Sequence, residues 1–470
     1  MTPPALPDDL FATLPPAVQA YIRHLEALVA QIPILAARIA ALEAQLRQNS
    51  SNSSKPPSTD GPHVKPAPPR PSSGRKRGGQ EGHPRHERTL LPADETHDHK
   101  PSHCGQCRAA LTGDDPDPIL DQVVDLPVKL RHVIHHRRHT LTCPDCQTRT
   151  AAAPVPAAAS GFGPRLQAAT AYLSGVGRLG KRSIRTLLAD VCDIPMSLGS
   201  VSKLEAKASA ALEPIHAEAL DHTQGQDANV DETGWKQGPD RAWLWVAVTQ
   251  TLTVFLIRPK RNRAAFDDLV GPTPGVLTTD RYSVYTHLPA ERRQVCWAHL
   301  RRDFQAMIDR ANGGSSLGVE LLAHAEILFD HWQKVRDGTR TRRWFETTHR
   351  DWLREEVRAL LTQGTQCSCP LTARVCRDVL RVEASLWTFA GVAGVEPTNN
   401  AAERAVRHAV WWRKTSYGTD SETGSRFVER LLSVVASCRT QGRSVLAFLT
   451  EAITAHRDRT PSPSLLPGMA

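Results

Sequence analysis

The strongest constraint on the fold lies between residues 228 and 280, where strand-like apolar runs replace the helical patterns of the rest of the chain. Trp243–Val248 and Leu252–Ile257 read as strands separated by a Thr-Gln-Thr turn, and Ala228–Asp231 reads as the end of an earlier strand. Arg261–Val270 has a helical pattern, and Gly275–Asp280 is a further predicted strand. With helices before and after this stretch, the sequence predicts a multidomain α+β protein.

Two of these predicted strands end at an aspartate, Asp231 and Asp280. Adjacent carboxylates repel each other unless a cation lies between them. Oxygen-only ligands favour Mg²⁺ or Mn²⁺, and a pair of such ions suits phosphodiester chemistry. Glu403, at the start of a helix that Asn400 would cap, is the candidate third carboxylate.

Alternatives to this metal site remain open at the level of sequence. An aspartate at a strand end is an ordinary turn residue. Asn400 and Glu403 also have the spacing of a capping box, in which the glutamate only binds the backbone of the cap residue. Glu232, next to Asp231, is an alternative ligand.

Two Cys-x-x-Cys motifs, Cys104–Cys107 and Cys143–Cys146, indicate a small zinc module. Four thiolates form a tetrahedral site that suits structural Zn²⁺, and a module with few large apolar residues needs such a staple. The spacer of 35 residues is longer than the commonest template, and it contains a strand-like stretch, Leu130–Leu141. Two unrelated pairs of reduced thiols are the alternative reading. Substitute histidine ligands would be His103, His132, His135 and His136.

The N-terminal region predicts a helical zipper followed by a tether. Apolar residues from Leu25 to Leu46 recur at alternating spacings of three and four, which is a heptad seam. Pro33 should kink or interrupt this helix, and packing of the helix on its own domain is the alternative. Residues 49–90 are rich in Ser, Pro, Gly and basic residues and predict a disordered linker. The seam comprises Leu25, Leu28, Ile32, Leu35, Ile39, Leu42 and Leu46.

A helix-turn-helix is the prediction for the next region. Ser183–Asp190 reads as a short helix and Cys192–Pro195 as a turn, and Ser197 is placed to cap a second helix. A plain helical hairpin is the alternative. Farther along, Leu317–Leu361 also has a helical pattern.

The net charge of +9 is unevenly distributed. Residues 51–90 carry +5 and residues 397–470 carry +4, whereas residues 221–300 are neutral. Clustered positive charge indicates a polyanionic partner bound in a salt-dependent way. The chain has no apolar run near the roughly 18 residues of a membrane span and no secretory signal, which predicts a cytoplasmic protein without disulfides and without a membrane partner.

Four sequence blocks resemble the core of one enzyme family. Asp231-Glu-Thr-Gly-Trp235, Thr279-Asp280-Arg-Tyr282, Cys296-Trp-Ala-His-Leu-Arg-Arg302 and Asn399-Asn-Ala-Ala-Glu403-Arg404 are similar to blocks of bacterial insertion-sequence transposases of the sixty-six type. The Ser/Pro-rich tether and the doubled Cys-x-x-Cys also resemble that family. The resemblance covers about residues 20–450 in family order, with Thr398 where relatives commonly have Asp.

This resemblance implies a DDE transposase with an RNase H-like core. It implies that Asp231, Asp280 and Glu403 hold Mg²⁺ or Mn²⁺, with a helical insertion between Asp280 and Glu403, and that the cysteines hold Zn²⁺. The reaction would be cleavage at the element's ends and attack of the freed 3′-hydroxyl on target DNA. The expected partners are double-stranded DNA, as terminal inverted repeats and as target, and a second copy of the chain or more, with accessory proteins left open. The expected location is the nucleoid of a bacterial cytoplasm.

Three other functions are compatible with the sequence patterns. They are a non-catalytic sequence-specific DNA-binding protein, an RNase H-like nuclease without strand transfer, and an assembly protein built on the zipper. Trp411 and Trp412 could stack on a splayed base, or they could be buried. The predicted DNA contacts are Arg75, Lys76, Arg77, Lys181, Arg182, Arg185, Lys203, His299, Arg301, Arg302, Arg404, Arg407, Arg413 and Lys414.

The predicted domain organisation follows from these segments. The boundaries are 15–48 for the zipper, 49–90 for the linker, 91–155 for the zinc module, 160–220 for the helix-turn-helix region, 221–310 for the first part of the catalytic core, 311–390 for the helical insertion, 391–455 for the second part of the core and 456–470 for a tail.

Overall fold

The computed structural model describes most of the chain. The predicted contacts Arg75, Lys76 and Arg77 lie outside the described residues. The chain divides into two units, one made of Met1–Val64, His136–Thr186 and Met196–Ala470, the other of Lys65–His135 and Leu187–Pro195. The described residues are 8–46, 48–49, 52, 90–117, 119–127, 129–155, 161–272 and 274–468.

The N-terminal region contains a short helix, α1 (Asp8–Ala12), and a 31-residue helix, α2 (Pro16–Leu46). The helix continues through Pro33, so the predicted interruption is wrong. All seven residues of the heptad seam are exposed, from 41% for Leu25 to 86% for Leu46. The seam is therefore available to another helix.

A two-stranded antiparallel sheet lies in the cysteine-rich region. It pairs β1 (Thr140–Thr142) with β2 (Arg149–Ala151). The strand predicted over Leu130–Leu141 is therefore wrong for residues 130–139, because the pairing with β2 begins only at Thr140. A long run of strand-like residues does not form a strand where no neighbouring strand pairs with it.

Three helices precede the main sheet: α3 (Pro164–Gly175), α4 (Lys181–Cys192) and α5 (Leu198–Thr223). The predicted cap of α5 is confirmed, because the Ser197 side chain accepts a hydrogen bond from the Ser200 N–H. The buried face of α5 includes Ala208, Leu212 and Ile215, which belong to the same apolar core as the sheet.

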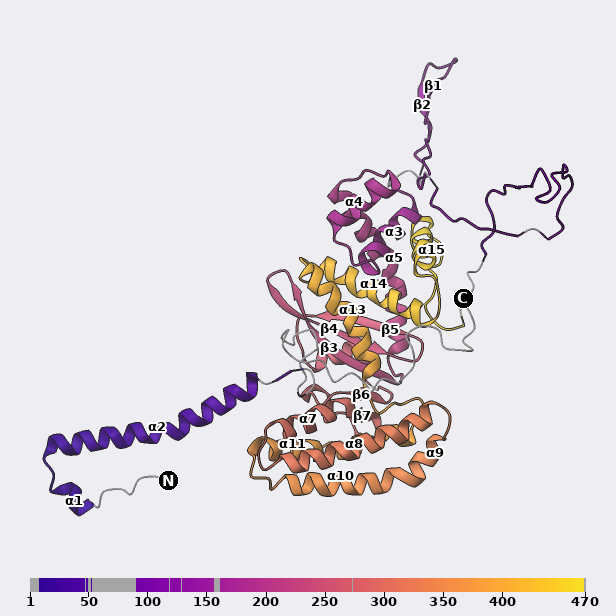
Figure 1. Cartoon of the computed structure of the whole chain (residues 1–470). Coiled ribbons are helices and arrows are strands. Elements are labelled where there is room, and N and C mark those ends of the chain that lie inside the picture. The colour runs from indigo at the N-terminus through magenta and orange to yellow at the C-terminus, as the bar shows by residue number, and fades with distance from the viewer. Residues whose placement is uncertain are drawn as a thin grey trace. The chain divides into compact units, whose positions relative to one another are not determined.

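The main sheet has five strands in the order β5-β4-β3-β6-β7 (Figure 1). The first three strands are antiparallel, whereas β6 pairs with β3, and β7 with β6, in parallel. The fold is therefore mixed α/β, with a mixed sheet. The bounds are β3 Ala228–Gln237, β4 Asp240–Val248, β5 Thr253–Arg258, β6 Leu277–Thr279 and β7 Arg293–Val295, with α6 (Arg263–Val270) between β5 and β6.

The strand that carries Asp231 is longer than the sequence predicts. It was expected to end at Asp231, but β3 continues to Gln237, with Asp231 opposite Val246 of β4. Pairing with nine residues of β4 carries the strand through Gly234, a residue that by itself weakens a strand. Asp231 therefore lies inside the sheet, while Asp280 directly follows β6.

The free edge of the sheet at β5 is covered by a helix. This helix, α14 (Glu422–Thr440), follows α13 (Asn400–Ser416) and precedes α15 (Val445–Asp458). Backbone N–H groups of Thr253, Phe255 and Ile257 donate to side chains of α14, to Ser437 Oγ at 3.0 Å, Ser433 Oγ at 2.8 Å and Glu429 Oε2 at 2.8 Å. An edge strand presents such unpaired groups to other chains unless they are covered.

The segment between β7 and α13 is helical and has its own apolar core, which includes Trp297, Phe304, Trp332 and Phe389. Figure 1 shows α8 and α10 running side by side in this segment. No helix in the described ranges is both long and apolar enough to span a bilayer. The helices of this segment are α7 (Trp297–Asp309), α8 (Ser315–Arg336), α9 (Arg342–Phe345), α10 (Asp351–Gly364), α11 (Pro370–Leu380) and α12 (Thr388–Gly391), with the short elements η5 (Glu346–Arg350) and η6 (Glu383–Leu386). Two further short elements, η3 (Ser283–Tyr285) and η4 (Ala290–Arg292), lie between β6 and β7.

Candidate active site

Helix α13, which carries Glu403, is fixed along strand β3, which carries Asp231. Near the end of the helix, the Arg413 guanidinium donates to the Gly234 carbonyl of β3. Beyond the helix, the Thr419 N–H donates to the Lys236 carbonyl at 2.9 Å. Gly418 has φ +109°, and a Cβ there would lie 2.3 Å from the Lys236 oxygen, so only glycine fits this close approach.

The segment before α13 is attached to the same part of the sheet. The Asn399 side chain donates to the Val230 carbonyl at 2.7 Å, and the Asn399 N–H donates to Cys296 Sγ at 3.1 Å. The Trp297 N–H donates to the Pro397 carbonyl. Since both ends of α13 are held on β3, Glu403 is brought to the region of Asp231.

Asn399, and not the predicted Asn400, is the N-cap residue of α13. Asn399 makes no side-chain capping bond: its amide N–H donates to the Val230 carbonyl, and its Oδ1 accepts no hydrogen bond from the described residues. The capping-box alternative is therefore wrong, since Glu403 is directed to side chains of α7.

Asp231 lies among other carboxylates. Burial raises its pKa well above the ordinary value, and the negative charges of Glu232, Asp280 and Glu403 raise it further. Its Oδ1 accepts a hydrogen bond from the Glu232 N–H at 2.9 Å, which acts in the opposite direction. The like-charge effect of Asp280 and Glu403 on Asp231 brings the three predicted residues into one electrostatic group.

Asp280 is held rigidly at the end of β6. Its Oδ1 accepts a hydrogen bond from the Tyr282 N–H at 2.8 Å. Its carbonyl accepts from the guanidinium of Arg293, a residue of β7 that is fully buried and whose pKa burial lowers to about 10. The backbone that carries the carboxylate is therefore fixed by a neighbouring strand.

Glu232, the alternative ligand, is already paired. It accepts hydrogen bonds from Arg261 and from the Tyr285 hydroxyl. Arg261 in turn lies over the rings of Tyr282 and Trp243, with its Cζ at 3.5 and 4.9 Å from their centroids. Successive side chains of a strand point to opposite faces of the sheet, so the side chains of Glu232 and Asp231 lie on opposite faces of β3.

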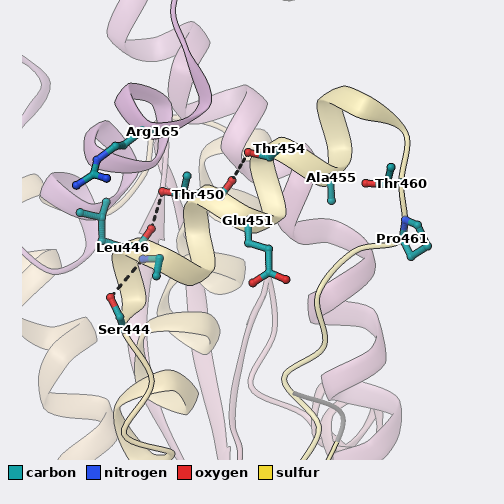
Figure 2. Close-up of a pocket in the computed structure, with 10 residues that line it drawn as sticks. Arg165, Ser444, Leu446, Thr450, Glu451, Thr454, Ala455, Thr460 and Pro461 are labelled. Atoms are coloured by element: carbon teal, nitrogen blue, oxygen red, sulfur yellow. Dashed lines mark hydrogen bonds between the residues drawn. The ribbon is translucent and has the colours of Figure 1, made fainter. Parts of the chain in front are cut away.

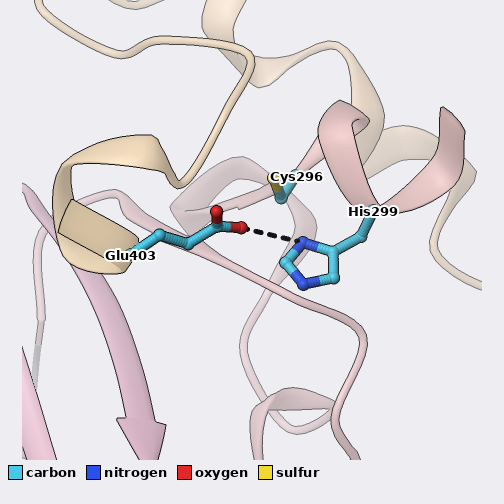
Figure 3. A group of neighbouring side chains, drawn as sticks. All are labelled: Cys296, His299 and Glu403. Atoms are coloured by element: carbon cyan, nitrogen blue, oxygen red, sulfur yellow. Dashed lines mark ion pairs between the residues drawn. The ribbon is translucent and has the colours of Figure 1, made fainter. Parts of the chain in front are cut away.

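Glu403 meets two side chains of helix α7, as Figure 3 illustrates for His299. Glu403 Oε1 lies 3.7 Å from His299 Nδ1 and 3.5 Å from Arg302 Nη2. Burial lowers the pKa of His299, and the nearby Arg302 lowers it further, which favours the neutral ring. His299 Nδ1 is buried and has no hydrogen-bond partner among the residues the structure describes.

Cys296, His299 and Glu403 form a group that could hold a metal ion. Their ligand atoms lie within 4.8 Å of one another (Figure 3). The sequence prediction placed His299 only among DNA contacts and missed Cys296. The spacing Cys296-x-x-His299 was the available signal, because residues three apart share one face of a helix.

The donor set fits a bound cation in two respects. A cation would offset the burial and the carboxylate repulsion that together raise the pKa of Asp231. It would also give the orphaned His299 nitrogen a partner. Carboxylate oxygens favour Mg²⁺ or Mn²⁺, whereas imidazole and thiol favour softer ions, so the group leaves the identity of the metal open.

The two Cys-x-x-Cys motifs adopt matching turns. The Arg108 N–H donates to the Cys104 carbonyl, and the Gln147 N–H donates to the Cys143 carbonyl. Arg108 and Gln147 both have left-handed φ angles, 63° and 59°. Hydrogen bonds lower the pKa of Cys104 and of Cys146, which favours the thiolate that binds zinc. The largest effect comes from backbone groups at Cys104 and from the hydrogen bond with the Thr148 side chain at Cys146.

The predicted DNA contacts differ in how much of each side chain the fold already uses. Arg301 pairs with Glu326, Lys181 lies 3.4 Å from Glu205, and Arg413 is bound to β3. Arg302 and His299 face Glu403. The other described candidates are exposed: Arg182, Arg185, Lys203, Arg404, Arg407 and Lys414.

A hollow of about 610 Å³ lies elsewhere, between α3 and α15 (Figure 2). Arg165 and Glu451 contribute its charges. The side chains of Ser444, Thr450 and Thr454 are bonded to the backbone of α15. None of the three predicted catalytic carboxylates lines this hollow.

Comparison with known proteins gives two kinds of match. A family of unknown function (DUF6444) matches residues 12–89. Two Sinorhizobium fredii proteins are similar to this chain: uncharacterized protein y4qI is 25% identical over 46% of the chain and 43% of its own length. Uncharacterized protein y4hP is 23% identical over 76% of the chain and 70% of its own length.

The model of the transposase IS66 family matches residues 160–426, which is more than half of the chain. The match contains β3, β6, α7 and α13, and thus the whole group around Asp231 and Glu403. The family supports a transposase role and, with it, binding to DNA. By this match the chain belongs to the transposase IS66 family.

Proposed function

We propose that this protein is a DDE transposase that cuts DNA at the ends of an insertion sequence and joins the freed 3′ ends to target DNA. The observation that carries the proposal is the environment of Asp231, whose pKa is raised by burial and then by the charges of neighbouring carboxylates, Asp280 and Glu403 among them. The mixed sheet, with three antiparallel strands, a helix and then two parallel strands, supports an RNase H-like core. The helices between β7 and α13 would be its insertion.

Asp231, Asp280 and Glu403 would hold Mg²⁺ or Mn²⁺. The ions would supply stabilisation of the negative charge that develops on the phosphate. Arg302 and His299 would hold the Glu403 carboxylate in position, and Asn399 would hold its helix on β3. Such positioning accounts for much of catalysis when the protein forms no covalent bond with its substrate.

The flanking regions would bind and pair DNA ends. The exposed seam of α2 supports self-association as a dimer or larger assembly. The matching cysteine turns support a four-thiolate Zn²⁺ site made by Cys104, Cys107, Cys143 and Cys146. The exposed basic residues of α4 and α5 support DNA contact by a helix-turn-helix, and the basic tether would add phosphate contacts. The domain boundaries given above and action in the bacterial nucleoid are parts of the proposal, which leaves the participation of accessory proteins open.

The test is Mg²⁺-dependent cleavage of DNA that contains the sequences flanking this gene. Asp231→Asn, Asp280→Asn and Glu403→Gln should each abolish cleavage and leave DNA binding intact. Asp240→Asn, which changes an exposed carboxylate of the same sheet, is the matched control and should cut normally. Cleavage retained by Asp231→Asn would contradict the proposal.

A second assay separates a transposase from a nuclease of the same fold. Substrates labelled at the 3′ end are incubated with the protein, Mg²⁺ and a target plasmid. Covalent transfer of the label to the plasmid supports transposition, and cleavage without transfer favours the nuclease. Binding without cleavage favours a non-catalytic DNA-binding protein.

A further inference from the structure

One face of α13 carries a line of cations with a tryptophan among them, and none of these cations forms an ion pair within the described part of the chain. We call Arg404, Arg407, Trp411 and Lys414 the α13 stripe. Their spacing of three, four and three places them on one face of the helix, and all four are exposed. The single acidic residue of α13 is Glu403, which faces His299 and Arg302.

Trp411 is unusual among the neighbouring aromatic residues because it is 57% exposed, whereas the adjacent Trp412 is buried. An exposed indole in a cationic line is not explained by packing. Single-stranded nucleic acids are bound by this combination, in which cations contact the phosphates and an aromatic ring stacks on a base.

The loop between α3 and α4 places a basic side chain next to the indole ring of Trp411. Arg178, in the loop between α3 and α4, has φ 57°, a left-handed conformation that residues other than glycine rarely adopt. Its Nη2 lies 2.8 Å from His408 Nδ1, and its Cζ lies 5.9 Å from the centroid of Trp411. The loop thus places a fourth cation, Arg178, beside the exposed indole.

We propose that the α13 stripe binds the unpaired end of the DNA strand at the catalytic site, with one base stacked on Trp411 and phosphates on Arg404, Arg407 and Lys414. We assign DNA as the occupant because the cations of this face can contact phosphates and the Trp411 ring can stack on a base. The proposal rests on the proposed function only in placing the scissile phosphate at Glu403. Trp411 lies eight residues beyond Glu403, or about 12 Å at the helical rise. This distance corresponds to roughly three to four nucleotides of a stacked strand.

The test measures binding in EDTA by fluorescence anisotropy, so that it does not depend on cleavage. The probes are a blunt duplex, the same duplex with a 3′ extension of about four thymidines, a length taken from the spacing above, and a duplex with an abasic extension of equal length. The wild-type protein should prefer the thymidine extension to the abasic one. Trp411→Ala should lower affinity for the thymidine probe by about 5-fold to 150-fold and leave the abasic probe unaffected.

Four variants make the result specific. Trp411→Phe should keep the preference because it keeps a stacking ring. Trp352→Ala, which removes a 39% exposed indole from α10, should keep it as well. Arg404→Ala and Arg407→Ala should weaken binding of both probes that carry an extension and lower its salt dependence, and should affect the blunt duplex less.

The proposal is overturned if Trp411→Ala binds the thymidine probe as the wild type does, or if Trp352→Ala loses as much affinity. The proposed function fails in a different way, through absence of Mg²⁺-dependent cleavage in a protein that still discriminates between the probes.

Discussion

The covered edge of the sheet gives a sharp prediction about Ser433. This residue, on α14, accepts a hydrogen bond from the Phe255 N–H at 2.8 Å and donates to the Glu429 carbonyl at 2.7 Å. Both Ser433 and Phe255 are fully buried. Ser433→Ala therefore leaves a backbone N–H of the edge strand without a partner and out of reach of water.

The expected cost follows from this burial. An unsatisfied buried donor costs about 1–3 kcal/mol, and the fully buried site favours the middle of that range, about 2 kcal/mol. Ser437→Ala should cost a similar amount, because Ser437 both accepts from the N–H of Thr253 and donates to its carbonyl. The two effects should add only approximately, since the serines lie one helical turn apart.

Hydrogen exchange of the β5 amides is the appropriate assay, because a chain with several cores need not unfold in one step. Protection of the amides of residues 253–257 should fall about 30-fold in Ser433→Ala, which corresponds to about 2 kcal/mol. Ser316→Ala, at an exposed helical position in α8, should change β5 exchange by less than about 0.5 kcal/mol. Unchanged exchange in Ser433→Ala would refute the reasoning.

Three further predictions concern other buried contacts. Burial lowers the pKa of His216 to about 4, so as the pH falls below about 6.5 the unfolded chain binds a proton at this residue before the folded chain does. The wild type should therefore lose about 2 kcal/mol of stability at this residue between pH 7 and pH 5, and His216→Gln should not. Urea unfolding at both pH values measures the difference. Asn399→Ala should lower the rate of Mg²⁺-dependent cleavage about 100-fold, because it loosens the helix that carries Glu403. The free energy of urea unfolding should fall by at most about 2 kcal/mol. A cleavage rate equal to that of the wild type would count against this role. Gly175→Ala should lower the melting temperature at a cost of about 1–3 kcal/mol, because a Cβ there would lie 2.7 Å from the Leu431 side chain; a melting curve equal to that of the wild type would contradict it.

Sequence reasoning located the strands β4 and β5, helix α6 and the cap of α5 because these depend on local signals. Alternating or continuous apolar runs and the Ser197 side chain act over a few residues. The same reasoning ended β3 too early and made Asn400 the cap of α13. Both errors have one origin, because the partners that decide these points, β4 and Val230, are not local to the pattern being read.

Of the group that could hold a metal ion, sequence reasoning named Glu403 as a ligand but not Cys296 or His299. Asp231, Asp280 and Glu403 stood out through motif resemblance, whereas Cys296 and His299 became ligand candidates only when α7 was placed beside α13. Glu232 could not be distinguished from Asp231 by sequence. Its pairing with Arg261 and Tyr285 distinguishes them in the folded protein.

The sequence by itself indicated the family, much of the local secondary structure and a candidate set of three carboxylates. Only the tertiary structure decided which side chains meet, because the contacts that hold α13 on β3 join residues far apart in the chain, as Asn399 and Val230 are, 169 positions apart. Periodicity specifies which face of a helix or strand is apolar. It does not specify which distant segment that face will pack against, since that choice depends on the packing of the whole core.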